Sequence, residues 1–278
     1  MQIVDSHVHF WHPEQRRYAW LDEIPALNRP ILPRDYDIAT DSIDIAAIVF
    51  VQAACKDNQA LDEVKWVNTL DERIEGIVAF APLEKGDAVR DWLDTLSGYA
   101  RVKGVRRLIQ SEELGFAIQP TFIQGVQALA DYDFSFDICV YHYQLPDVID
   151  LVQQCPQVNF VLDHGGKPNI KGALFDPWRE HIDALAQFDN ISCKISGLVT
   201  EADHAHWTAD NLAPYIDHLL STFGSQRLMF GSDYPVVNRA GEYERWFNVL
   251  QSQLSGLSAT QKQDLFYNNA RSLYRIDG

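Results

Sequence analysis

The stretch Gln2-Ile3-Val4-Asp5-Ser6-His7-Val8-His9 is a β-rich segment that ends in two histidines. Its β-branched residues favour an extended chain. In a strand, His7 and His9 lie two positions apart and therefore point to the same face, together with Asp5. Two imidazoles on one face can bind a single divalent cation. A His-x-His pair is common by chance, so its meaning depends on the rest of the chain.

Seven further β-rich segments follow, and segments with helical spacing separate them. The predicted strands are residues 2–9, 44–52, 74–81, 102–109, 134–140, 158–163, 191–196 and 227–232. The predicted helices are residues 58–70, 87–96, 120–131, 145–154, 177–188, 211–223, 242–254 and 260–274. Val49-Phe50-Val51 and Phe160-Val161-Leu162 are continuous apolar runs, as expected for strands that are buried on both faces.

This alternation predicts an α/β protein with a parallel sheet. Eight strands are enough to close a (β/α)₈ TIM barrel, and 278 residues suit one such domain, so we expect a single barrel domain over residues 1–278. A doubly wound open sheet explains the alternation with fewer strands and stays open as an alternative. The longest irregular stretch, residues 11–34, follows the first strand. We expect it to form a partial lid or to pack on the barrel rim.

Composition limits the partners and the compartment. The 39 acidic and 23 basic residues give a net charge of −16, which repels nucleic acid and anionic membranes. No apolar stretch reaches the roughly 18 residues of a membrane span, and no signal-peptide pattern is present, so we expect a cytoplasmic protein. The four cysteines form no Cys-x-x-Cys pair, and Cys139 and Cys193 lie in apolar runs typical of a core. A homo-oligomer is compatible with these features.

Polar residues gather where the predicted strands end. In a barrel of this class the active site lies at the carboxyl ends of the strands. Besides His7 and His9, the polar and aromatic residues at or just after these ends are Arg106, Arg107, Tyr141, His142, Tyr143, Asp163, His164, Lys194, Ser196, Ser232 and Asp233. Their convergence on one rim predicts a catalytic site. The chain has no Gly-x-Ser-x-Gly, P-loop or early Gly-x-Gly-x-x-Gly motif, so serine-triad and nucleotide chemistry are unsupported.

Five segments resemble the amidohydrolase superfamily, and the similarity is greatest to its amidohydrolase-2 sugar lactonases. They are residues 3–11, 102–107, 161–168, 193–198 and 231–236, which occur in the family's order along nearly the whole chain. The resemblance implies that His7, His9 and Asp233 surround a metal. It also implies that Asp233 takes a proton from the attacking water, that His164 orients substrate or water, and that Arg106 polarises a carbonyl or holds a carboxylate.

The chain also departs from the family in ways that bear on the metal. Binuclear members bridge their metals with a carboxylated lysine late in the fourth strand, where Arg106-Arg107-Leu108 stands here. The resemblance therefore implies one divalent ion, with Zn²⁺ as the first choice, rather than two. Some lactonases of this group use no metal, so a metal-independent reaction stays open. His142 fits a metal ligand or a substrate contact equally well, and Tyr234 stands where many relatives have Trp.

The expected activity is hydrolysis of a sugar-acid lactone, a small-molecule substrate. Water attack on an ester places negative charge on the carbonyl oxygen, which a cation or Arg106 can stabilise. A carboxylate such as Asp233 can accept the water's proton. We expect Trp11, His142, Lys194 and Tyr234 to contact the substrate. The alternatives are a decarboxylase of the same superfamily, which would act on an aromatic or dicarboxylic acid, and a binding protein on an inactive barrel.

Overall fold

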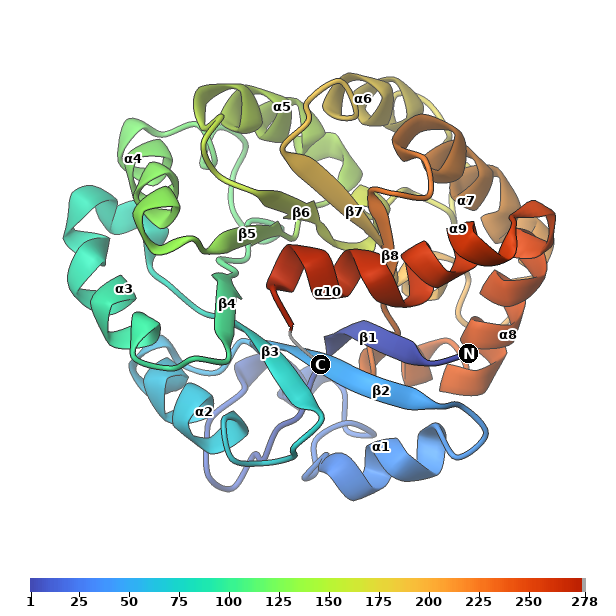
Figure 1. The fold of residues 1–278 in the computed structure, drawn as a ribbon, viewed down its shortest axis with the longest axis horizontal. Coiled ribbons are helices and arrows are strands. Elements are labelled where there is room, and N and C mark those ends of the chain that lie inside the picture. The colour runs from blue at the N-terminus through green and yellow to red at the C-terminus, as the bar shows by residue number, and fades with distance from the viewer. Residues whose placement is uncertain (277–278) are drawn as a thin grey trace.

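The eight predicted strands are all present in the computed structural model, which describes residues 1–276. Each strand is parallel to the next, and their order in the sheet follows the chain. The strands are β1 (Ile3–Val8), β2 (Ile45–Val51), β3 (Ile74–Ala79), β4 (Val102–Val105), β5 (Ser135–Ile138), β6 (Phe160–Leu162), β7 (Ile191–Ile195) and β8 (Leu228–Phe230). Figure 1 shows them as a central ring with helices around it.

The last strand returns to the first and closes the barrel. Val8 forms a parallel bridge with Tyr234. The His9 backbone N–H donates to the Tyr234 carbonyl at 2.7 Å, and the Asp233 N–H donates to the His7 carbonyl at 2.9 Å. The predicted (β/α)₈ barrel is therefore confirmed, and the open-sheet alternative is wrong. Closure also brings Asp233 beside His7 and His9, although more than two hundred positions separate them in the chain.

Helices surround the strands and mostly occur where the sequence predicts them. They are α1 (Pro33–Ala39), α2 (Ala60–Val67), α3 (Arg90–Ser97), α4 (Pro120–Ala128), α5 (Leu145–Gln154), α6 (Trp178–Leu185), α7 (Ala209–Phe223), α8 (Tyr243–Gln253), α9 (Ala259–Gln263) and α10 (Asn269–Tyr274). α1 was not predicted because it has only seven residues and follows a proline-rich stretch. The helix predicted over 260–274 is divided by a π-helical turn at Asp264–Asn268.

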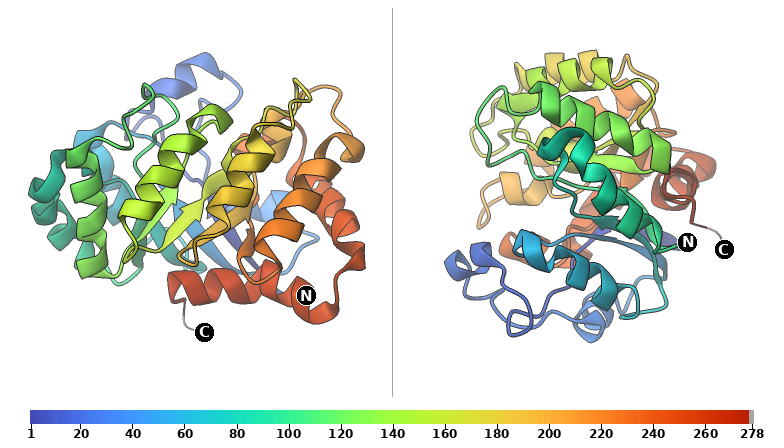
Figure 2. Two further views of the ribbon diagram at one scale, coloured as in Figure 1. Left: turned by 90° about the horizontal axis from the view of Figure 1, so that it is seen from above. Right: turned by 90° about the vertical axis from the view of Figure 1, so that its left-hand side faces the viewer.

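The interior of the barrel has an apolar layer at its amino-terminal end, and the C-terminal segment covers this layer. Its buried residues are Val4, Ala47, Val49, Val51, Val78, Val161, Met229, Ala270, Tyr274 and Ile276. α10 crosses the barrel in Figure 1, and Figure 2 places the C-terminal helices at the opposite end from the segment that follows β1. The amino-terminal mouth is thus closed by packing, and the carboxyl ends of the strands are left for a site.

An irregularity in β1 changes which side chains face the interior. The pairing of β1 with β2 shifts register between Asp5 and Val8. Val4 belongs to the inner cluster, whereas Asp5 accepts hydrogen bonds from Tyr36 of α1 (2.9 Å) and Tyr243 of α8 (3.0 Å), which lie outside the barrel. The expectation that Asp5 shares a face with the two histidines is therefore wrong, because a bulge re-aims the following side chains.

The segment after β1 forms a wall over the carboxyl ends of the strands. Trp11 pairs with Ile31 in an antiparallel bridge, and its fully buried indole N–H is shared between the carbonyls of Leu27 and Arg29. These contacts fix the base of the loop. Farther along, the indole N–H of Trp20 donates to the Ala53 carbonyl at 2.9 Å, which holds the loop against the end of β2.

Helices of residues 1–276 are all too short or too polar to cross a bilayer.

Candidate active site

A cavity of about 720 Å³ opens at the carboxyl ends of the strands. His9, Arg106, His164 and Asp233 lie in its wall, as the sequence predicts for the catalytic residues. The loop after β1 supplies a further part of the wall through Ala19, Trp20, Glu23 and Ile24. The irregular stretch therefore acts as the partial lid that was one of its two expected roles.

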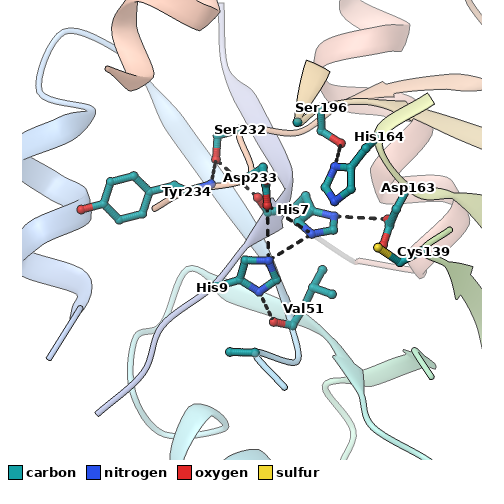
Figure 3. A network of polar contacts seen from close by, with 12 residues as sticks. His7, His9, Val51, Cys139, Asp163, His164, Ser196, Ser232, Asp233 and Tyr234 are labelled. Atoms are coloured by element: carbon teal, nitrogen blue, oxygen red, sulfur yellow. Dashed lines mark hydrogen bonds and ion pairs between the residues drawn. The ribbon is translucent and has the colours of Figure 1, made fainter. Parts of the chain in front are cut away.

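His7, His9 and Asp233 converge at this end of the barrel (Figure 3). The Nε2 atoms of the two histidines are 3.2 Å apart. Oδ1 of Asp233 is 3.7 Å from His7 Nε2 and 3.4 Å from His9 Nε2. All three side chains are almost fully buried. Three ligand-type atoms therefore form a compact triangle with little access for bulk water.

Polar contacts at the Nδ1 atom of each imidazole fix the ring and leave Nε2 facing the triangle. His9 Nδ1 lies 2.6 Å from the Val51 carbonyl, which can only accept, so Nδ1 carries the proton. His7 Nδ1 lies 3.2 Å from Oδ1 of Asp163. Burial lowers the pKa of both imidazoles and favours their neutral forms. With the protons on Nδ1, both Nε2 atoms are unprotonated and lie within 3.7 Å of Asp233 Oδ1.

This arrangement fits a divalent cation. Ligands arranged tetrahedrally at about 2.0–2.1 Å from zinc are about 3.3–3.4 Å apart. The triangle of His7, His9 and Asp233 has edges of 3.2, 3.4 and 3.7 Å. Two neutral nitrogens that face each other at 3.2 Å repel through their lone pairs unless a cation or a proton lies between them. The polar partners on Nδ1 are also those that metal-binding histidines usually have.

Arg106 follows β4 and borders the same triangle. Its Nη2 donates to the Gln52 carbonyl at 2.6 Å, and its Nη1 lies 3.2 Å from Asp163 Oδ2. Nη1 is also 3.3 Å from His7 Nε2. The neighbouring carboxylate helps to keep the guanidinium charged although burial opposes the charge. Arg106 thus places a fixed positive charge next to the position where an ester carbonyl would be polarised.

His164 and Asp233 have opposite charge preferences. Burial lowers the pKa of the His164 imidazole to about 4, so the ring is neutral at pH 7. Its Nδ1 is 2.9 Å from Ser196 Oγ, which fixes the orientation of the ring. For Asp233, burial alone would raise the pKa, but His164 and the two triangle histidines lower it below the usual range. Asp233 is therefore a carboxylate, able to accept a proton.

A charged network lies directly beneath the triangle, inside the barrel. Nζ of Lys194 is 2.6 Å from Asp137 Oδ2, 3.1 Å from Asp163 Oδ1 and 3.3 Å from His7 Nδ1. Tyr274 of α10 donates to the same Asp137 oxygen at 2.6 Å. All of these side chains are fully buried. The network links the C-terminal helix to the ring orientation of His7.

Backbone strain is concentrated at the cavity. The non-glycine residues with positive φ are Ala54, Asp133, His164, Lys167, Ala173, Asp233 and Arg275. Four of them, Ala54, His164, Lys167 and Asp233, line the cavity. Such conformations are costly for residues with a Cβ and occur most often at functional sites. Gly197 leaves room for His164 in this conformation, because a Cβ at position 197 would lie 2.5 Å from His164 Nδ1.

Four residues expected to contact substrate lie elsewhere. Trp11 is fully buried at the base of the lid, and Lys194 is fully buried in the network beneath the triangle. The Tyr234 ring points away from the histidines (Figure 3) and packs 5.3 Å from the Tyr36 ring. His142 lies beside Tyr143, and its neighbour Tyr141 lines the cavity instead. None of the four lines the cavity, because the local strand pattern does not show where a side chain packs, and their contact with substrate stays a prediction.

Other lining residues were not recognised from the sequence. Lys167 and Glu201 line the cavity, and so does Cys139, which was expected only in the core. Asp137 completes the buried network. A charged residue within an apolar strand was the available signal for Asp137, as it was for Lys194. No comparable signal marks Glu201, which lies in a short 3₁₀ turn, Leu198–Glu201, after β7.

The fold and this site are those of a (β/α)₈-barrel enzyme with a His-x-His centre. The chain belongs to the amidohydrolase family: the family model (Amidohydro_2) matches residues 4–276.

Individual relatives agree with this membership. The chain is 31% identical to an L-fucono-1,5-lactonase of Burkholderia multivorans, with 98% of this chain and 96% of that protein aligned. It is 25% identical to an L-rhamnono-gamma-lactonase of Scheffersomyces stipitis, over 73% of this chain and 69% of that protein. An amidohydrolase of Burkholderia multivorans, solved with bound zinc, superposes with a TM-score of 0.89 at 29% identity and covers both chains completely.

Proposed function

We propose that this protein hydrolyses the ester bond of a sugar-acid lactone at the cavity above His7, His9 and Asp233. One observation carries most weight: the Asp233 carboxylate and two unprotonated histidine nitrogens converge within 3.7 Å, with the Arg106 guanidinium beside them. The relatives named as lactonases of fucono- and rhamnonolactone support the substrate class.

The residues of this chain can perform each step of such a hydrolysis. Asp233, whose pKa lies below the usual range, accepts a proton from the attacking water as the water oxygen bonds to the carbonyl carbon. Arg106 stabilises the negative charge that forms on the carbonyl oxygen. Asp233 then returns the proton to the ring oxygen as the carbon–oxygen bond breaks. His164, fixed by Ser196, orients the water or the substrate.

His7, His9 and Asp233 would hold the divalent cation, and the zinc-bound relative supports Zn²⁺ as its identity. When bound, the cation supplies Lewis-acid polarisation of the ester carbonyl. Asp163 keeps the proton of His7 on Nδ1, and the Val51 carbonyl does the same for His9. A single ion is expected because Arg106-Arg107-Leu108 stands where binuclear relatives carry a bridging lysine.

A panel of aldonolactones tests the proposed activity. L-fucono-1,5-lactone and an L-rhamnonolactone are each mixed with enzyme in weak buffer, and a pH indicator follows the acid that ring opening releases. We expect hydrolysis well above the spontaneous rate and no CO₂. A parallel assay measures CO₂ from 2,6-dihydroxybenzoate. If this acid releases CO₂ while no lactone is opened, the protein is a decarboxylase and the proposal is wrong.

Metal removal tests the cation site. Protein purified without chelator is expected to contain about one equivalent of Zn²⁺, because three ligands and an open position are typical of catalytic zinc. Chelation should abolish most of the activity, and added Zn²⁺ should restore it. His7→Gln and His9→Gln should lose the metal, whereas His206→Gln, whose side chain is 83% exposed, should keep it. Full activity in metal-free protein would leave carbonyl polarisation to Arg106 alone.

A further inference from the structure

Lys167 and Glu201 lie together in the cavity wall and have no part in the chemistry described above. Lys167 follows the end of β6, and Glu201 ends the short turn after β7. Their charged atoms, Lys167 Nζ and Glu201 Oε1, are 3.8 Å apart. This distance is too long for a hydrogen bond, so the two groups attract each other without satisfying each other's hydrogen-bonding capacity.

Both side chains keep unused hydrogen-bonding capacity. The Lys167 ammonium has three N–H groups, and one of them donates to Gln110 Oε1 at 2.6 Å. Within residues 1–276, no group donates a hydrogen bond to the Glu201 carboxylate. The Glu201 side chain is only 18% exposed, and that of Lys167 only 14%. A partly buried carboxylate without donors is costly unless a ligand or water provides them.

The pair offers donors and acceptors side by side, which is the combination that hydroxyl groups require. A hydroxyl donates one hydrogen bond and accepts others, so neighbouring hydroxyls can donate to Glu201 and accept from Lys167. Trp20, held in the lid by its bond to Ala53, contributes an aromatic surface to the same cavity. A cavity with an apolar surface and a few placed polar groups is typical of a small-molecule site.

The charges at this position disfavour an anionic group. A ring carboxylate is best held by an unopposed cation, such as a bidentate arginine. Lys167 is instead paired with Glu201, whose negative charge would repel a second carboxylate. Over the whole cavity wall, three positive residues (Arg106, Lys167, Arg239) match three negative residues (Glu23, Glu201, Asp233). The side chains of the wall therefore contribute no net positive charge, and at the position of Lys167 the neighbouring Glu201 opposes a ring carboxylate.

We propose that Lys167 and Glu201 form a hydroxyl-binding subsite that selects a neutral, polyhydroxylated lactone and rejects lactones with a ring carboxylate. The proposal rests on the proposed lactonase function and goes further by assigning the specificity to two residues. The subsite would also distinguish this protein, by substrate class, from a lactonase that opens lactones with two carboxylates.

The test compares two lactones with the same six-membered ring. L-fucono-1,5-lactone carries hydroxyls, whereas δ-valerolactone carries none. In Glu201→Gln, kcat/KM for the hydroxylated lactone should fall about 10–100-fold, mainly through KM, since a hydrogen bond to a charged group is lost. The value for δ-valerolactone should change less than threefold. Lys167→Met should show the same selectivity. Glu113→Gln, on an exposed residue outside the cavity, is the matched control.

Each outcome distinguishes the subsite from the reaction. A similar fall for both lactones, or no fall for either, would overturn the subsite and leave the lactonase function intact. Wild-type protein that opens 2-pyrone-4,6-dicarboxylate faster than L-fucono-1,5-lactone would overturn the preference for neutral substrates. If the wild type opens none of these lactones, the proposed function itself is wrong. Thermal unfolding of each variant shows whether a loss of activity comes from unfolding.

Discussion

Replacing Asp233 with Asn is expected to reduce kcat by about 10²–10⁴-fold, the usual contribution of a general base. The amide has nearly the same shape as the carboxylate but cannot accept the proton from water. It also binds a cation more weakly than the carboxylate that lies 3.4 Å from His9 Nε2 and 3.7 Å from His7 Nε2. The rate of lactone opening, followed with a pH indicator at saturating substrate, measures the effect.

The control for this variant is Asp91→Asn, which makes the same change on the exposed surface of α3. It should leave kcat unchanged. Metal content and thermal unfolding of Asp233→Asn are measured alongside, so that loss of a base can be distinguished from loss of the metal or of the fold. An Asp233→Asn variant that keeps its metal, its fold and the full kcat would refute the role of Asp233 as the base.

Replacing Lys194 with Met is expected to lower the free energy of unfolding by about 3–5 kcal/mol, as when one partner of a buried ion pair is removed. Lys194 lies between two fully buried carboxylates, with Nζ 2.6 Å from Asp137 and 3.1 Å from Asp163. Without the ammonium, these carboxylates lose their shared cation in the barrel interior. Denaturant unfolding measures the change, and Lys65→Met, on an exposed lysine of α2, is the control.

A second variant separates charge from packing. Asp137→Asn combined with Lys194→Met removes one charge of each sign, so it should recover part of the stability that Lys194→Met loses. If Lys194→Met is instead as stable as the wild type and only its KM rises, Lys194 contacts substrate and the structural role assigned to it here is wrong. The two readouts, stability and KM, therefore decide between the two roles of this residue.

Much of the fold could be predicted from local sequence patterns. Each strand is a short β-rich run, and the predicted helix 145–154 coincides with α5 because a proline at its start and amphipathic spacing define it. The predicted helix 260–274 was less accurate, since nothing local marks the π-helical turn at Asp264–Asn268. The boundaries of elements depend on packing, which the local pattern does not contain.

The sequence predicted the residues of the candidate site that stand at strand ends. It was less accurate for residues whose position depends on tertiary contacts. His9, Arg106, His164 and Asp233 all line the cavity, and the roles proposed for them stay predictions. Lys194, at the end of a strand like these residues, faces a buried network instead. The direction of a side chain alone cannot distinguish the floor of a cavity from the layer beneath it.

The sequence by itself predicted eight strands and placed two histidines and an aspartate at the carboxyl ends of their strands, whereas closure into a barrel rather than an open sheet was decided by the structure. Strand periodicity and the position of a residue along its strand are local properties, and they suffice for predicting the strands and these positions. Only the tertiary structure decided that Asp5 turns outward at a bulge, that Lys194 joins Asp137 and Asp163, and that Lys167 meets Glu201. Each of these depends on distances between atoms far apart in the chain, which barrel closure and side-chain packing set.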